Sequence, residues 1–143
     1  MRLVDVNVLV YAFREDAPAH VEYRRWVEAS VQAHEAYAVS DQVLSGFLRI
    51  VTHPRVFHPP TPIAAALAFA EAYRGQPNAV AVAPDARHWA VFTHLCTTCN
   101  ARGNLIPDAW FAALAIESGC EWITTDRDYA RFPGLRWKHP LES

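Results

Sequence analysis

Hydrophobic residues along the chain alternate between short runs and longer stretches in which they recur every three or four positions. A short apolar run between polar or turn-forming residues is typical of a buried strand, whereas spacing of three and four indicates an amphipathic helix. This pattern predicts strands at residues 2–4, 37–39, 78–84, 122–124 and 135–137. It predicts helices at residues 7–14, 18–34, 41–51, 62–73, 87–99 and 107–118, with a single helical turn at 126–131.

Strands and helices that alternate along a chain form a parallel sheet with helices on both faces. We therefore expect an α/β fold with a short-stranded parallel sheet. The residues at the expected helix starts agree with this order. Asn7 would cap the first helix, and Ser40 or Asp41 would cap the third. Pro107 would occupy the first position of the late helix.

The length of 143 residues matches a single domain, and a hydrophobic fraction of 52% is sufficient to build its core. No apolar run approaches the length of a membrane-spanning helix. Asp5 and Asn7 interrupt the early stretch in which a signal peptide would be apolar. These features argue against a membrane or secreted protein. They predict one domain over residues 1–143 and a cytoplasmic location.

Composition gives little support to a DNA-binding protein or to a structural zinc site. The formal net charge of −2 does not indicate a constitutive DNA-binding protein, and it neither supports nor excludes RNA as a substrate. The three cysteines include one C-x-x-C, at Cys96 and Cys99, whereas a structural zinc site usually needs two such pairs. We expect all three thiols, with Cys120, to pack as small apolar residues.

Most of the aspartates lie where the predicted strands end. In an open parallel sheet, ligands bind beyond the carboxyl ends of the strands. Five of the seven aspartates fall at that edge, whereas the glutamates lie mainly on helix faces. These five are Asp5, Asp41, Asp108, Asp126 and Asp128.

Four of these aspartates also have a purely structural interpretation. Asp108 would complement the dipole of the late helix, and Asp41 would cap the third helix. Asp126 and Asp128 would be ordinary turn residues. Asp5 is harder to explain in this way, because it interrupts an apolar segment that should be buried.

Several carboxylates in one partly buried space repel one another and lose solvation, which raises their pKa values. A divalent cation would remove both problems, and oxygen ligands without matching histidine or cysteine favour Mg²⁺ or Mn²⁺ over zinc. Such a site suits phosphodiester hydrolysis, because metal ions activate water and stabilise the attacking and leaving oxygens. The chain lacks the G-x-S-x-G, Walker, G-x-G-x-x-G and H-E-x-x-H motifs of other chemistries.

Four segments, in order along nearly the whole chain, resemble the PIN-domain VapC family. They read L-V-D-V-N-V-L-V, V-L-S-G-F-L-R-I-V-T-H-P-R-V-F, N-L-I-P-D-A-W-F-A-A-L-A-I-E-S-G-C and I-T-T-D-R-D-Y-A-R-F-P-G-L-R-W. Members of this family are the toxin ribonucleases of VapBC toxin–antitoxin pairs. The resemblance implies a PIN-like three-layer α/β/α sandwich and an Mg²⁺-dependent endoribonuclease, with Mn²⁺ able to substitute.

The resemblance also implies partners and site residues. It implies a homodimer and a small VapB-like antitoxin whose C-terminal segment lies across the toxin, so that contact with DNA is indirect, through the antitoxin. The catalytic acids would be Asp5, Asp108 and Asp126. The metal ligands would be Asp5, Asp108, Asp126 and Asp128. Asn7 and Thr125 would be supporting residues beside these acids.

The chain departs from the family pattern in the third helix. Many PIN domains carry a glutamate there, and the matching place is Gly46. Asp41, five residues earlier, either supplies the missing charge as a metal ligand or caps the helix. Arg49 on the same helix either forms an intramolecular salt bridge or contacts a substrate phosphate.

Two other functions remain open on the sequence alone. Rossmann-like phosphatases also carry an aspartate after the first strand, but theirs is a nucleophile followed two residues later by a second aspartate. Here that second place is Asn7, and Lys138, the only lysine, does not fit their downstream lysine. The other alternative is a degenerate PIN domain that binds RNA or a protein without cutting, because Gly46 replaces the expected acid.

Overall fold

The computed structural model describes residues 1–142. Its five strands are β1 Arg2–Val4, β2 Tyr37–Val39, β3 Ala79–Ala81, β4 Glu121–Ile123 and β5 Trp137–Lys138. Its helices are α1 Val6–Phe13, α2 His20–Gln32, α3 Asp41–Val51, α4 Ile63–Arg74, α5 His88–Thr98 and α6 Leu105–Ser118, with a 3-10 turn, η1, at Arg127–Arg131. The predicted order of strands and helices is confirmed, and most differences are shifts of a few residues at the ends.

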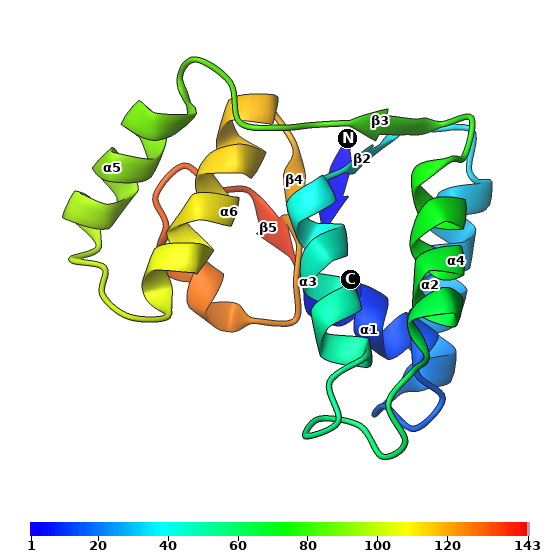
Figure 1. Ribbon diagram of the computed structural model, residues 1–143. Helices are drawn as coiled ribbons and strands as arrows, with labels where there is room; N and C mark the ends of the chain where they lie inside the picture. The colour runs from blue at the N-terminus through cyan, green and yellow to red at the C-terminus, as the bar shows by residue number, and fades with distance from the viewer. Residues whose placement is uncertain (143) are drawn as a thin grey trace.

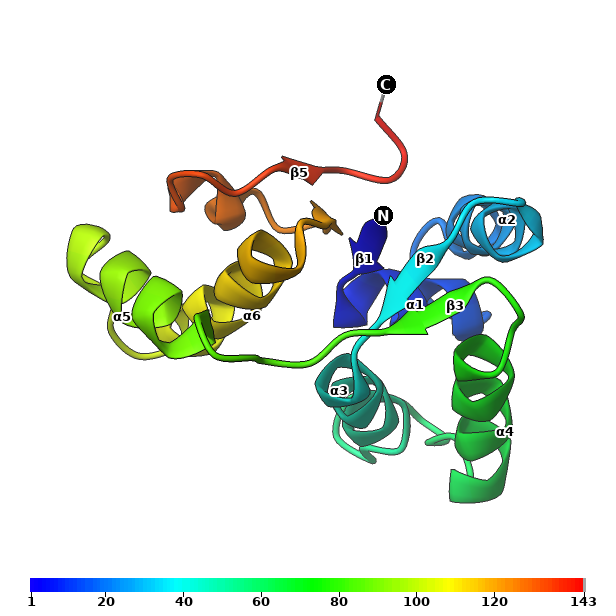
Figure 2. The same ribbon diagram turned by 90° about the horizontal axis from the view of Figure 1, so that it is seen from above.

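The strands form one sheet in the order β3-β2-β1-β4-β5, and every neighbouring pair is parallel. Seen from above, α3, α4 and α6 lie along one side of the sheet and α2 along the other, with α5 outside α6 (Figure 2). This arrangement confirms the predicted α/β/α architecture. Because the strands are parallel, their carboxyl ends share one edge; in Figure 1, β1 runs downward to this edge, where α1 follows it. We call this the carboxyl edge.

The central strands are short but almost fully buried. Leu3 of β1 and Trp122 of β4 are at most 1% exposed, and all three residues of β2 are buried. Burying a large apolar side chain contributes about 1.5–3 kcal/mol relative to leaving it exposed. On the inner face of α6, small alanines such as Ala109 and Ala112 are buried and let this helix lie close to β4. The carboxyl edge is therefore built on a buried, well-packed part of the molecule.

One helix cap differs from the prediction, and the other decides between the two predicted residues. Asp5, not Asn7, caps α1, and its side chain accepts the N–H of the next residue at 2.7 Å. Ser40, not Asp41, caps α3, and its hydroxyl accepts an N–H three residues on at 3.3 Å. A capping residue needs an extended backbone so that its side chain can turn back to the free N–H groups. Asp5 and Ser40 have that backbone, whereas Asn7 and Asp41 already lie inside their helices.

Two helix starts also differ from the predicted ones. Helix α6 begins at Leu105, so Pro107 is its third residue rather than its first. A proline is tolerated there because the first N–H groups of a helix have no partner within it. Helix α2 begins at His20, two residues after the expected Pro18. Within residues 1–142, none of the helices is both long enough and apolar enough to cross a membrane.

Gly46 lies where α3 packs against α1. A Cβ atom built on Gly46 would lie 2.9 Å from Cγ2 of Val6, well inside the distance at which two carbon atoms attract. Val6 directly follows Asp5 in the chain. The glycine therefore allows the start of α1, next to the carboxyl edge, to lie tightly against α3.

We expect Gly46→Ala to lower the free energy of unfolding by about 1 kcal/mol. Overpacking costs about 1–3 kcal/mol, which outweighs a gain in helix propensity of up to about 1 kcal/mol. In a Val6→Ala background the clash is absent, and the same substitution should be stabilising. Urea denaturation of the four proteins measures both effects. An equal effect of Gly46→Ala in the two backgrounds would show that contact with Val6 is unimportant.

Candidate active site

The register of the two central strands sets Asp5 and Thr124 side by side. Val4 pairs with Ile123, and Asp5 and Thr124 are the next residues of their strands. The N–H of Asp5 still donates to the carbonyl oxygen of Ile123 at 2.8 Å, so the register holds to the end of the sheet. Thr124 then donates its hydroxyl to Oδ2 of Asp5 at 2.7 Å, and both residues are buried.

Thr124 also connects Asp5 to Asp126. Its Oγ1 accepts the backbone N–H of Asp126 at 3.0 Å. Asp126 in turn caps η1 and accepts the N–H of Asp128 at 2.9 Å. One buried hydroxyl thus holds the side chain of the first acid and the backbone of the third.

Asp108 reaches the same edge from the first turn of α6. The hydroxyl of Tyr129, a residue of η1, donates a hydrogen bond to Oδ1 of Asp108 at 3.2 Å. Tyr129 is itself 2% exposed, and its ring packs against Trp122 and Phe132. A core aromatic residue therefore presents its polar end to one of the predicted catalytic acids.

Burial and neighbouring charge perturb the ionisation of Asp5. The pKa of Asp5 rises from 3.8 to about 6, chiefly because burial disfavours the charged form. The negative charges of Asp108 and Asp126 raise this pKa further. The hydrogen bonds from Thr124 and from the N–H of Val6 act in the opposite direction but do not cancel the increase.

Asp108 lies in the same electrostatic environment. Its pKa is raised, first by burial and then by the charges of Asp126 and Asp128, while the hydrogen bond from Tyr129 lowers it. The structure therefore brings Asp5, Asp108 and Asp126 close enough to repel one another. Asp128 lies at the rim of this group, because its side chain is 64% exposed and faces Arg131 at 3.8 Å.

The three gathered acids offer only carboxylate oxygens, the donor set that suits Mg²⁺ or Mn²⁺. Within residues 1–142, no three His, Cys, Asp or Glu side chains are arranged so that they could hold a metal ion by themselves. Mg²⁺ needs fewer protein ligands, because it keeps several waters and is usually bound by one or two carboxylates together with substrate phosphates. A cation would also relieve the repulsion that raises the pKa of Asp5 and of Asp108. The residues therefore fit an Mg²⁺ ion shared between protein and substrate.

Asp41 is turned away from this group. Because β1 and β2 are paired, Ser40 rather than Asp41 lies level with Asp5. The Asp41 carboxylate is 73% exposed and forms an ion pair with Arg74 of α4 at 2.8 Å. Arg74 also lowers the pKa of Asp41, the direction opposite to that found at Asp5.

The predicted supporting residues lie at the surface or beside the site. Asn7 and Arg49 are exposed, and none of the ion pairs among residues 1–142 includes Arg49. Thr125 is half-buried, whereas its neighbour Thr124 makes the hydrogen bonds to the acids. The cysteines are free thiols: Cys120 is buried, as expected, and the other two are half-buried.

Thr124 and Tyr129 are the site residues that sequence reasoning missed. Thr124 carried a usable signal, because it directly follows a buried strand and a buried hydroxyl must find a hydrogen-bond partner. Tyr129 carried a weaker signal, because an aromatic residue three positions after Asp126 is as typical of a hydrophobic core as of a functional site.

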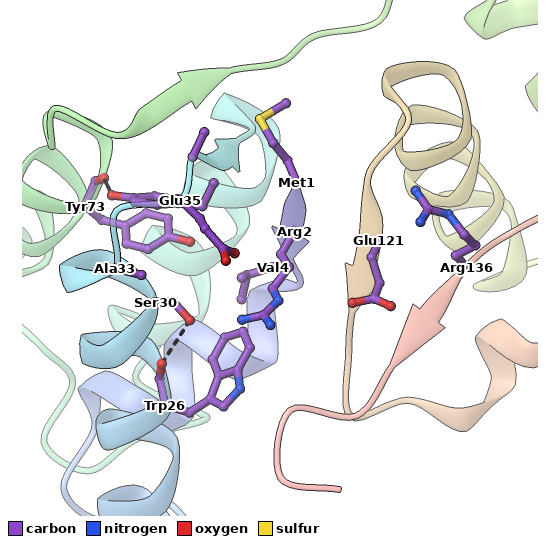
Figure 3. Close-up of a pocket in the computed structure, with 12 residues that line it drawn as sticks. Met1, Arg2, Val4, Trp26, Ser30, Ala33, Glu35, Tyr73, Glu121 and Arg136 are labelled. Atoms are coloured by element: carbon purple, nitrogen blue, oxygen red, sulfur yellow. Dashed lines mark hydrogen bonds between the residues drawn. The ribbon is translucent and has the colours of Figure 1, made fainter. Parts of the chain in front are cut away.

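A pocket at the opposite edge of the sheet is separate from these acids. It is lined by residues at the amino ends of the strands, including Arg2 and Glu121, and by Trp26 of α2 (Figure 3). The guanidinium of Arg2 lies 5.8 Å from the centroid of the Trp26 ring. Because the strands are parallel, the pocket and the acids lie at opposite ends of the sheet.

Asp5 should make the stability of the metal-free protein depend on pH. A carboxyl group whose pKa rises on folding binds its proton more tightly when folded, so stability falls as pH rises from 3.8 to about 6. Asp5→Asn keeps the shape of the side chain and removes its charge. In EDTA, the free energy of unfolding of the variant should rise relative to that of the wild type as the pH increases through this range, by up to about 3 kcal/mol. At higher pH the difference between the two proteins should stay constant.

Urea denaturation of both proteins between about pH 4 and pH 7 measures this difference. Added Mg²⁺ should reduce the difference at the upper end, because the ion stabilises only the folded state that binds it. A difference in stability that does not vary with pH would show that the Asp5 carboxylate is not strained by burial and charge.

Comparisons with known proteins find relatives along nearly the whole chain. The chain matches the model of the PIN domain over residues 2–135. It is 44% identical over 142 residues to ribonuclease VapC43 of Mycobacterium tuberculosis, covering 99% of this chain and 97% of that protein. It is 41% identical over 140 residues to ribonuclease VapC25 of the same organism, covering 98% and 99%.

Solved structures share the fold at low sequence identity. VapBC-1 from Haemophilus influenzae superposes with a TM-score of 0.70 at 15% identity, covering 99% of this chain and 98% of that chain. VapBC2 from Rickettsia felis, bound to a promoter DNA fragment, gives a TM-score of 0.69 at 17% identity, covering 96% and 97%. The family match along most of the chain and the ribonucleases of 41% and 44% identity lead to one conclusion: the chain belongs to the PIN-domain family of VapC ribonucleases.

Proposed function

We propose that this protein is an Mg²⁺-dependent endoribonuclease that hydrolyses RNA phosphodiester bonds at the carboxyl edge of its sheet, with Mn²⁺ able to replace Mg²⁺. The observation that carries the proposal is the gathering of Asp5, Asp108 and Asp126, where burial and mutual repulsion raise the pKa of Asp5 to about 6. Relatives named ribonucleases support RNA as the substrate class. In the cell, we propose, the protein acts in the cytoplasm as the toxin of a type II toxin–antitoxin pair.

Each acid has a distinct place in this proposal. Asp5 and Asp108 would hold the metal ion, and Asp126, with Asp128 at the rim, would add negative charge beside it. When bound, the metal ion would supply an activated water and a positive charge for the scissile phosphate. Thr124 keeps the Asp5 carboxylate in one orientation through its 2.7 Å hydrogen bond.

The substrate would approach from the solvent side of the acids. Asn7 is exposed on the first turn of α1, a helix that starts at the carboxyl edge. Arg49 is exposed on the last turn of α3 and lies outside the ion pairs within residues 1–142. Its guanidinium is therefore free to contact an RNA phosphate, a group that arginine binds well. In this proposal, Arg49 contributes to substrate binding rather than to the reaction.

The proposed partners follow from the same site. The solved structures that share this fold are named as VapBC complexes, one of them bound to promoter DNA. We propose that this protein likewise binds a VapB-like antitoxin, forms a homodimer and contacts DNA only through the antitoxin. A group of carboxylates attracts cationic side chains as well as metal ions. An arginine of the antitoxin would form charge-assisted hydrogen bonds there and block the site.

Asp5→Asn and Asp108→Asn should each reduce Mg²⁺-dependent RNA cleavage by at least about 100-fold. Loss of a residue that only supports a metal ligand typically costs about 10- to 100-fold, and loss of the ligand itself should cost more. Single-turnover cleavage of a labelled RNA of mixed sequence measures the rate. EDTA should abolish cleavage and excess Mn²⁺ should restore it, while thermal melting shows that both variants are folded.

Asp41→Asn is the matched control for this experiment. It makes the same chemical change at an aspartate that is exposed and paired with Arg74, so the wild-type rate is expected at every Mn²⁺ concentration. Wild-type rates in the two site variants would refute the proposed site. RNA binding without cleavage would favour a non-cutting module, and a trapped phosphoaspartate would instead indicate a phosphatase.

Antitoxin and metal ion should exclude one another at the site. If an antitoxin arginine occupies the space between Asp5 and Asp108, the complex should bind Mg²⁺ at least about tenfold more weakly than the free toxin, because the carboxylates are already neutralised. Isothermal titration of Mg²⁺ into the toxin and into the complex tests this. A complex made with an antitoxin in which that arginine is replaced by alanine should recover the affinity. Equal Mg²⁺ affinity with and without the antitoxin would contradict this mode of inhibition.

A further inference from the structure

We propose that Tyr129 is a positioning residue, which holds the Asp108 carboxylate in the orientation that a metal ion requires. The inference rests on the proposed function, because it concerns how the metal site is prepared. Tyr129 is not expected to touch the RNA or to exchange a proton with it. Its role is exerted through Asp108.

The first observation is the contact itself. The hydroxyl of Tyr129 donates to Oδ1 of Asp108 at 3.2 Å, and no other side-chain hydrogen bond within residues 1–142 reaches this carboxylate. A donor on one oxygen sets the rotation of the carboxylate plane. It also leaves Oδ2 free of any donor in the described chain. Asp108 is therefore oriented by one hydroxyl and keeps one oxygen for a cation.

The second observation is that Tyr129 itself is immobilised by the core. Its ring centroid lies 5.4 Å from that of Trp122 and 5.8 Å from that of Phe132, and both of these residues are at most 3% exposed. Offset and tilted aromatic pairs of this kind restrict the ring. By contrast, Asp108 is half-buried in the first turn of α6. The rigid partner in this pair is the tyrosine, and the group that needs orienting is the acid.

The third observation is that the segment after β4 supplies two hydroxyl donors, each to a different acid. Thr124 donates to Oδ2 of Asp5 at 2.7 Å, and Tyr129 donates to Oδ1 of Asp108. One short stretch of chain thus provides the hydroxyl donor for the buried Asp5 and for the half-buried Asp108, although the two acids lie on different elements. Metal ligands are commonly oriented by such donors, and the donors affect metal affinity.

The contact with Asp108 is made by the hydroxyl group of Tyr129, while its ring packs in the core. Phenylalanine would fill the same space in the core and would lack only this donor.

Tyr129→Phe should weaken Mn²⁺ binding by about 10- to 100-fold, measured without RNA from the electron paramagnetic resonance signal of free Mn²⁺. The Mn²⁺ concentration that gives half-maximal RNA cleavage should rise by the same factor. The rate at saturating Mn²⁺ should recover towards that of the wild type, because the acid itself is still present. A residue that only supports the fold would not separate metal affinity from maximal rate in this way.

Tyr37→Phe is the matched control. The hydroxyl of Tyr37 is also buried and donates to the carbonyl oxygen of Tyr73 at 2.5 Å, but it lies on β2, which begins at the opposite edge of the sheet. This variant loses a buried hydrogen bond of the same kind and should keep wild-type Mn²⁺ affinity. Thermal melting of both variants confirms that they are folded.

The outcomes separate this inference from the proposed function. Unchanged Mn²⁺ affinity in Tyr129→Phe, with a wild type that binds Mn²⁺ and cleaves RNA, would overturn the positioning role and leave the proposed function intact. An equal loss of affinity in Tyr37→Phe would also overturn it, because the effect would then be a general loosening of the fold. A wild type that neither binds Mn²⁺ nor cleaves RNA would remove the proposed function and the inference together.

Discussion

A carboxylate that is almost completely buried is the constraint on which the rest of the site depends. Asp5 is 8% exposed, and an ionised group in such a position is costly unless it is hydrogen-bonded or paired with opposite charge. The hydroxyl of Thr124 and the N–H of Val6 provide the hydrogen bonds. No basic side chain forms an ion pair with Asp5 within residues 1–142, and Asp108 and Asp126 add charge of the same sign. The arrangement is strained in the metal-free protein, and a divalent cation is the simplest way to relieve it.

The strain can persist because the surrounding structure holds the acids in place. Asp5 directly follows β1, the central strand of the sheet, and it also caps α1, so both its backbone and its side chain are restrained. Gly46 brings α3 tightly against the start of the same helix. Repulsion among the acids cannot be relieved by local movement without disturbing this packing. The rigid core thus holds the acids in fixed positions at its edge. Metal-assisted hydrolysis requires catalytic groups that are held in place in this way.

Much of the site is built from one short segment after β4. Thr124, Asp126, Asp128 and Tyr129 lie within six residues of chain, and each is fixed by a different contact in the sheet, in the turn or in the aromatic core. The acid that follows β1 and the acid of α6 each accept a hydrogen bond from this segment. The solved structures that share the fold at 15% and 17% identity show that the fold tolerates extensive change in sequence.

The sequence by itself determined the order of strands and helices, because the spacing of apolar residues is a local property that survives without knowledge of the fold. It also indicated that aspartates gather at one edge, since parallel strands place their carboxyl ends there, and the family resemblance selected Asp5, Asp108 and Asp126 from the five candidates. Only the tertiary structure decided the finer assignments. Pairing of β1 with β2 puts Ser40 level with Asp5, and Arg74, distant in sequence, draws Asp41 to the surface. Likewise, the meeting of Tyr129 with Asp108 joins an aromatic residue of η1 to a helix that precedes β4. Such contacts depend on strand register and on the direction of each side chain, and both are set by packing between segments far apart in the chain.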